Sequence, residues 1–336
     1  MNVSSSLPGS ALRAIIAPYA RADWRRSVFQ LATTLGCFVA VCAASYLLYP
    51  ISWLISLALA PLGGGLLVRL FALQHDCTHG SFFASHRANV WAGRLCSLFT
   101  VTPFLGWGRL HLLHHAEWND LQRRDLSDIY SACLTVREYN ALPRGKQLAY
   151  RLPRHPLFAI FLLPPLIFAL LLRLPLDTPR TMVRARRSIF LTDAALLALY
   201  GGLALLLGWQ RVLVVQLPIV AAGSMFGCWV LYVMHHFEDS RWLAPGEWDY
   251  AEASLAGSSW LGFPRVLHWL SGNLGVHHVH HLNARIPNYH LATAAEALQA
   301  SHPVRRVSLG AALRAPWLAL WDEDARRLVS FREAAA

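Results

Sequence analysis

The chain has 336 residues, of which 55% are hydrophobic and only 15% are charged, and its formal net charge is +11. This composition excludes an ordinary soluble domain, which carries about 25% charged residues. Arginines cluster before the first long apolar run and in the long connections, whereas the two short turns between paired runs hold one arginine between them. This is the positive-inside pattern of a helical membrane protein. We therefore expect a membrane protein and no nucleic-acid partner.

Four apolar runs of about 20 residues are long enough to cross the roughly 30 Å of hydrocarbon in a bilayer as helices. The first two runs are joined by a short turn, and so are the last two. This order predicts two helical hairpins whose long connections lie on the arginine-rich side, the cytoplasm. The predicted spans are residues 28–49, 51–73, 189–209 and 212–234.

Two further apolar segments are interrupted. Residues 90–107 contain an arginine, a proline and two glycines, and residues 156–172 contain adjacent prolines between flanking arginines. Both are predicted to be re-entrant or interfacial. The expected fold is all-α: one integral membrane domain over residues 1–336, with four transmembrane helices in two hairpins. A cytoplasmic histidine-rich cap is expected from residues 74–188 and 235–336.

Nine of the 16 histidines follow apolar segments, where a membrane helix would leave the bilayer. His75 and His79 are four residues apart, so one helix face presents both imidazoles. In an H-x-x-H-H cluster, the first histidine shares a face with either of the last two, and the adjacent pair can diverge toward two ions. With His235, the nine imidazoles exceed what one four- to six-coordinate ion accepts. The two H-x-x-H-H clusters are His111, His114 and His115, and His277, His280 and His281.

The histidine clusters leave several chemical interpretations open. Imidazole binds iron, zinc, copper or nickel, so the ligand type does not name the metal. A metal transporter or sensor is disfavoured because the clusters gather on one side of the predicted membrane, and a bis-histidine haem protein is a third possibility. Candidates to orient the ligands by accepting their second N–H are Asp76, Asp125, Asp128 and Asn273, although ion pairs with nearby arginines would explain the carboxylates equally well.

Aromatic residues also lie near the clusters. Trp107, Trp118, Trp260 and Trp269 could line a tunnel for an apolar substrate. Anchoring in the aromatic belt at the membrane surface is the favoured interpretation of these four tryptophans.

The three clusters resemble, in order and spacing, the histidine boxes of membrane fatty acid desaturases. The matching strings are residues 75–80, 111–115 and 277–281. Further strings at residues 123–139, 235–239 and 272–289 resemble the delta-12 (omega-6) acyl-lipid branch. The resemblance covers residues 73–289, nearly the whole chain.

This resemblance implies a di-iron centre held by the box histidines, with His235 as the additional ligand before the third box. It implies insertion of a double bond into lipid-linked acyl chains with dioxygen and two external electrons; a hydroxylase or ketolase with the same centre is the alternative. Because no G-x-G-x-x-G fingerprint is present, no bound flavin or nicotinamide is expected, and a ferredoxin- or cytochrome-type donor is. The expected location is the bacterial inner membrane. His236 departs from the family pattern, and the roles of His236 and His278 stay open.

Overall fold

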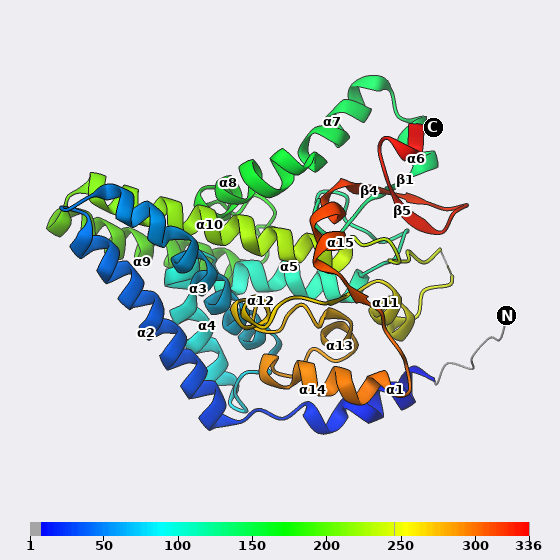
Figure 1. Cartoon of the computed structure of the whole chain (residues 1–336), viewed down its shortest axis with the longest axis horizontal. Helices are drawn as coiled ribbons and strands as arrows, with labels where there is room; N and C mark the ends of the chain where they lie inside the picture. The colour runs from blue at the N-terminus through cyan, green and yellow to red at the C-terminus, as the bar shows by residue number, and fades with distance from the viewer. Residues whose placement is uncertain (1–7, 245, 336) are drawn as a thin grey trace.

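A computed structural model describes residues 8–244 and 246–335 and is mostly helical (Figure 1). Four of its helices are long and apolar enough to cross a membrane, which confirms the four predicted spans. The third begins earlier than predicted, because its helix also includes the arginine-rich segment that precedes the apolar run. The four helices are α2 (Trp24–Leu48), α3 (Trp53–His79), α9 (Val183–Leu207) and α10 (Trp209–His235).

Local signals set where the spanning helices begin and end. The side chain of Asp23 caps α2 by accepting a hydrogen bond from the backbone N–H of Arg26 at 3.1 Å. Ser52 caps α3 in the same way. At its other end α3 stops at Gly80, whose φ of 67° belongs to the left-handed region that favours glycine. The last turn of α3 is therefore the one that carries His75 and His79.

Helices α3 and α10 form the most extensive helix pair of the molecule. They cross at Gly64 and Gly223, where a Cβ atom on Gly64 would lie only 2.6 Å from the backbone nitrogen of Gly223. Small residues allow this close backbone approach, which is how helices associate inside a bilayer without a hydrophobic driving force. The pair forms the frame from which the histidine-bearing helix ends project.

The two interrupted apolar segments are not straight spans. Helix α4 (His86–Thr100) has 15 residues and a length of about 22 Å, too short to cross a bilayer, and Pro103 separates it from α5 (Phe104–Glu117). Helix α7 (Arg144–Arg154) meets the segment Leu157–Arg173 at a bend of 49°. That segment consists of the π-helix η2 (Leu157–Leu162), α8 (Leu163–Ala169) and the 3₁₀-helix η3 (Leu171–Arg173).

The remaining elements form a cap over one end of the spanning helices (Figure 1). A buried apolar cluster joins α1, α13 and α14 to the end of α10. The cap helices are α1 (Gly9–Ile16), α6 (Val136–Ala141), α11 (Tyr250–Ala256), α12 (Arg265–Leu270), α13 (His277–Leu282), α14 (Asn288–Gln299) and α15 (Leu309–Arg314), with the 3₁₀-helices η1 (Ala17–Tyr19), η4 (Ala315–Trp317) and η5 (Glu333–Ala335).

Short strands, which the sequence patterns did not predict, pair segments of the cap that are distant in the sequence. Strand β4 (Leu318–Asp322) pairs in parallel with β1 (Leu134–Thr135) and antiparallel with β5 (Arg327–Ser330). Strand β2 (Trp260–Leu261) pairs in parallel with β3 (Arg306–Val307).

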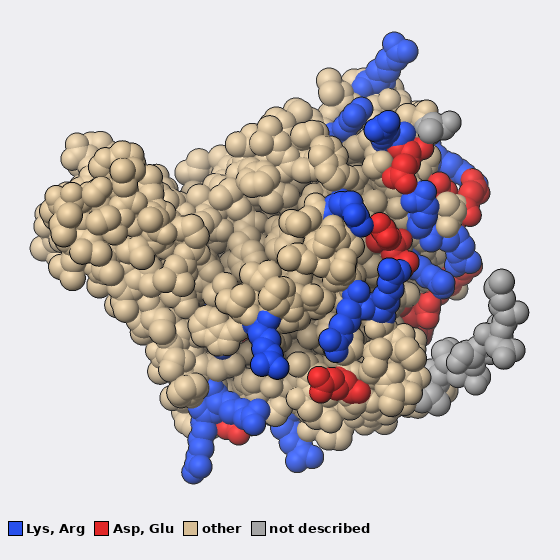
Figure 2. Space-filling model, viewed as in Figure 1, with Lys and Arg blue, Asp and Glu red and all other residues tan. Residues whose placement is uncertain are grey.

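Charged side chains follow the same division between spans and cap. Figure 2 shows them over the cap and at the start of α2, whereas the surface over the far ends of α2, α9 and α10 carries none on this face. Exposed leucines cover these spanning helices, as expected for surfaces in contact with lipid.

Candidate metal centre

The nine predicted ligands come from four helices that meet beneath the cap. His75 and His79 lie in the last turn of α3, and His235 is the last residue of α10. Helix α5 carries one H-x-x-H-H cluster and the short helix α13 carries the other. Because each of these helices points an end or a face at the same place, residues up to 206 positions apart in the sequence, from His75 to His281, become neighbours.

The imidazoles sort into two groups whose possible ligand atoms lie within 4.8 Å of one another. The groups touch, because the rings of His115 and His281 stack with their centroids 4.2 Å apart. Group 1 consists of His75, His79, His111, His115 and His280, and group 2 consists of His114, His235, His277 and His281.

Each group is suited to a cation. In group 1 the Nε2 atom of His111 lies 2.9 Å from Nε2 of His79 and 3.2 Å from Nε2 of His115. Each Nε2 carries either one N–H or one lone pair in the ring plane, so Nε2 of His111 can form a hydrogen bond along at most one of these two lines, and the close approach along the other is repulsive. A metal ion between the nitrogens would turn this repulsion into coordination. Group 2 has the same arrangement, with Nε2 of His277 3.1 Å from Nε2 of both His235 and His281.

Protonation states also favour metal binding, since a ligating imidazole must be neutral. Burial, reinforced by the neighbouring imidazoles, holds the pKa of His111, His115, His277, His280 and His281 well below the ordinary value. For His114, burial lowers the pKa to about 4 against the opposing charge of Asp128. These histidines are therefore uncharged at neutral pH and offer free lone pairs.

Asp76 is the predicted orienting residue that the structure places beside a ligand. Its Oδ1 lies 3.6 Å from Nδ1 of His75, and neither atom has a hydrogen-bond partner among the described residues. Its Oδ2 accepts hydrogen bonds from the backbone N–H and the side-chain amide of Asn288, at 2.7 and 2.8 Å. Asn288 thus fixes the carboxylate and connects α14 to the candidate metal centre, a role that the sequence patterns did not assign to it.

In the described part of the chain, the side chains of the other three candidates for orienting residues do not hydrogen-bond to a histidine side chain. Asp125 accepts hydrogen bonds from the N–H and hydroxyl of Ser127 in an exposed turn. Asp128 likewise holds its own loop through Tyr130 and Ser131, so only its charge reaches His114. The side-chain amide of Asn273 donates to the carbonyl of Asn288 at 3.1 Å.

The alternative ion pairs of these carboxylates with arginines are also not found among the described residues. The arginines at 123 and 124 bind other acids: Arg123 pairs with Asp120 at 2.6 Å, and Arg124 pairs with Glu138.

His236 and His278 are buried next to the two groups but belong to neither. The ring of His236 stacks on Tyr232 at a centroid distance of 4.2 Å, and the ring of His278 stacks on Trp260 at 5.5 Å. Both rings point away from the groups because each lies one residue, about 100° of helix, from a group member. The isolated histidines His86, His155, His290 and His302 also lie outside both groups.

The belt interpretation is wrong for two of the four tryptophans, Trp118 and Trp260, which are buried. Trp118 is buried with its ring centroid 3.9 Å from that of His235, and Trp107 stacks on His111 at 4.7 Å. Trp260 is buried against His278, and only Trp269 is exposed in the predicted manner. The sequence spacing could have predicted these contacts. Trp107 lies four residues before His111 and Trp118 four residues after His114, so each tryptophan shares a helix face with a histidine.

Comparison with known proteins agrees with this geometry. A family model described as fatty acid desaturase matches residues 51–309. A protein named fatty acid desaturase from Bacillus subtilis is 39% identical over 317 residues, which are 94% of this chain and 89% of the relative. The chain belongs to the fatty acid desaturase family.

More distant relatives of the desaturase come from Synechocystis sp. A protein named sn-1 acyl-lipid omega-3 desaturase (ferredoxin) is 29% identical, covering 76% of this chain and 68% of the relative. A protein named sn-1 oleoyl-lipid 12-desaturase is 27% identical, covering 74% of this chain and 68% of the relative. The predicted family is thereby confirmed, and the nearly equal identities do not distinguish the position of the double bond.

The contact of Asp76 with His75 predicts a defined loss of metal affinity. In Asp76→Asn the amide keeps an acceptor for Asn288 but removes the negative charge beside Nδ1 of His75, which orients the ring and raises its basicity. We expect the desaturase to bind metal about 10–100-fold more weakly, as for other orienting carboxylates, measured by competition with a chelator of known affinity. Asp125→Asn, in its exposed turn, is the control and should match the wild type. Equal affinity of Asp76→Asn and wild type would remove Asp76 from the centre.

Proposed function

We propose that this desaturase is a di-iron, dioxygen-dependent enzyme that introduces a double bond into lipid-linked acyl chains, with delta-12 (omega-6) regiochemistry. The observation that carries the proposal is the convergence of nine imidazoles into two adjacent groups under a cap on membrane helices. Iron would be held by His75, His79, His111, His115 and His280 in group 1 and by His114, His235, His277 and His281 in group 2.

The metal is required by the chemistry of the substrate. A methylene group inside an acyl chain has no acidic proton, so side-chain acids and bases cannot remove its hydrogens. When bound and reduced, iron would activate dioxygen, which is the oxidant that the removal of two hydrogens from such a group requires.

The protein's own contribution is to hold and shield this centre. Trp107 and Trp118 pack against ligand rings, and the apolar cluster of the cap covers the site, so that bulk water is kept out.

Two external electrons are needed for each double bond, and we propose a ferredoxin- or cytochrome-type donor. The name of one Synechocystis relative specifies ferredoxin. The exposed side chains of Arg184 and Arg187, in the first turns of α9, would suit an acidic carrier.

The proposed orientation puts the cap and both termini in the cytoplasm of a bacterial inner membrane. All nine imidazoles lie at the cap end of the spans, and the charged residues of the viewed face gather there (Figure 2). An excess of arginine marks the cytoplasmic side of a membrane protein.

Fatty acid profiling tests the reaction and its regiochemistry together. We expect expression in a bacterial host without polyunsaturated lipids, supplied with oleate, to produce an 18-carbon acid with double bonds at positions 9 and 12. Mass spectrometry of derivatised lipid extracts locates the new bond, and His280→Gln serves as the inactive control. A hydroxylated or oxo product would contradict desaturation and support the alternative hydroxylase or ketolase. A double bond nearer the methyl end would overturn the delta-12 assignment.

A further inference from the structure

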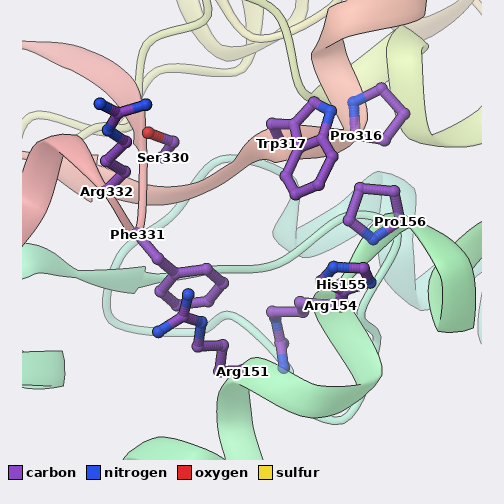
Figure 3. Close-up of a pocket in the computed structure, with 9 residues that line it drawn as sticks. All are labelled: Arg151, Arg154, His155, Pro156, Pro316, Trp317, Ser330, Phe331 and Arg332. Atoms are coloured by element: carbon purple, nitrogen blue, oxygen red, sulfur yellow. The ribbon is translucent and has the colours of Figure 1, made fainter.

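A basic cavity of about 430 Å³ lies at the bend between α7 and the apolar segment Leu157–Arg173, away from the metal centre. The end of α7 and Pro156 form one wall, and η4 and β5 form the other (Figure 3). Its volume falls in the usual range of ligand sites, about 300–1,000 Å³. The lining residues are Arg151, Arg154, His155, Pro156, Pro316, Trp317, Ser330, Phe331 and Arg332.

Among the described residues, the lining of this cavity has three arginines and no acidic side chain. None of the three pairs with a carboxylate among the described residues. The nearby carboxylate of Glu333 is occupied, because it accepts hydrogen bonds from Ser330 and Arg327. The described residues therefore leave the positive charge of the cavity uncompensated, and the cavity is suited to an anion.

The positive charge of Arg154 is buried and held in place by neighbouring groups of the fold. Its side chain is only 4% exposed, and Nη2 donates to the carbonyl oxygens of Leu126 and Ala132, at 3.0 and 3.3 Å. The guanidinium carbon lies 3.8 Å from the centroid of the Tyr150 ring. Its Nε is buried without a hydrogen-bond partner in the described structure. A buried guanidinium held by neutral groups alone is costly, and a bound anion would offset that cost.

One side of the cavity continues into apolar surface. Leu157 and Phe161, just beyond Pro156, are half-exposed, and so is Trp317, whose ring lies at the cavity in Figure 3. Leu313, in the preceding helix α15, is 63% exposed. An anion bound here would have hydrocarbon next to it, as it has at the headgroup level of a bilayer.

We propose that this cavity binds the phosphate of an anionic glycerophospholipid, with Arg151 and Arg154 at the phosphate and the acyl chains along Leu157, Phe161 and Trp317. Arginine recognises phosphate through charge-assisted hydrogen bonds, and basic pockets beside membrane helices bind anionic headgroups. The proposal requires insertion into a membrane but not the metal chemistry, so failure of one leaves the other standing.

Lipid titration of the purified full-length protein in neutral detergent tests this site. We expect native mass spectrometry to show phosphatidylglycerol bound, with about tenfold or more weaker binding in Arg151→Gln, because a hydrogen bond to a charged group is lost. Arg151→Lys, which keeps the charge, should lie between the two. Arg144→Gln, an exposed arginine on the same helix outside the cavity, should match the wild type. Arg151 is chosen because changing Arg154 would also leave two buried carbonyls without a donor.

The probes separate the sources of phosphate. Dioleoylglycerol, which lacks phosphate, and sn-glycerol 3-phosphate, which lacks acyl chains, should each bind far more weakly than phosphatidylglycerol. Binding of glycerol phosphate as tight as that of the lipid would overturn the lipid assignment, and so would equal binding of dioleoylglycerol. Unchanged phosphatidylglycerol binding in Arg151→Gln, together with slower reduction by ferredoxin, would assign the cavity to an acidic protein instead.

Discussion

Fully loaded desaturase is expected to contain two transition-metal ions per chain, and the His277→Gln variant about one. His277 is one of only four imidazoles in group 2, and its Nε2 lies 3.1 Å from Nε2 of both His235 and His281. Its loss leaves three ligands there, while group 1 keeps all five. Desaturation should fall by more than about a hundredfold, since even orienting residues around a metal cost 10–100-fold. Metal analysis by mass spectrometry and acyl-chain profiling measure the two effects.

The adjacent residue provides a matched control. His278 is on the same helix and equally buried, but it stacks on Trp260 and belongs to neither group. His278→Gln should keep two ions and most of the activity. His79→Gln, which leaves four imidazoles in group 1, should lose less metal than His277→Gln. Wild-type protein that never binds more than one ion, or equal loss in His277→Gln and His278→Gln, would contradict the two-group assignment.

A single methyl group at the crossing of α3 and α10 is expected to destabilise the whole molecule. In Gly64→Ala the new Cβ would lie 2.6 Å from the backbone nitrogen of Gly223 and 2.8 Å from Cβ of Ala222, so the helices must separate. Overpacking of this kind costs about 1–3 kcal/mol. Because α3 ends in His75 and His79 and α10 in His235, the separation should also reduce metal content. Thermal unfolding in detergent and metal analysis measure these changes.

Gly201→Ala in α9 is the matched control, because in the described part of the chain a Cβ at that position would meet no atom within 4 Å beyond its chain neighbours and its own helix backbone. There the alanine should stabilise the helix by up to about 1 kcal/mol, since glycine is the poorer helix former. The two substitutions are therefore expected to have opposite signs. A melting temperature for Gly64→Ala at or above that of the wild type would show that the helices do not approach as closely as the structure indicates.

Patterns close together in the sequence predicted much of this protein. The four spans are continuous apolar runs, and bilayer thickness alone fixes the length of such a run. The spacing of His75 and His79, and of the two H-x-x-H-H clusters, follows helix geometry. It predicted that adjacent histidines diverge, and the structure puts His114 in group 2 and His115 in group 1.

Helix geometry left open which distant histidines share a group. The i, i+3 and i, i+4 neighbours of His111 are equivalent on a helix surface. The crossing of α5 with α3 and α13 puts His115, not His114, beside His111, His79 and His280. The same holds for Asp76, which was one of several candidate orienting residues in the sequence. Its hydrogen bonds with Asn288, 212 residues away, distinguish it from the others.

The sequence by itself determined the membrane class, the four spans, the nine histidines and the family, because each is a local pattern of apolarity or spacing. Only the tertiary structure decided the division into groups of five and four, the packing of Trp118 on His235, and the basic cavity built from residues 151–156 and 316–332. These features depend on how closely α3 and α10 approach and on where the cap segments dock. Such long-range contacts arise from packing between segments, which no local pattern encodes.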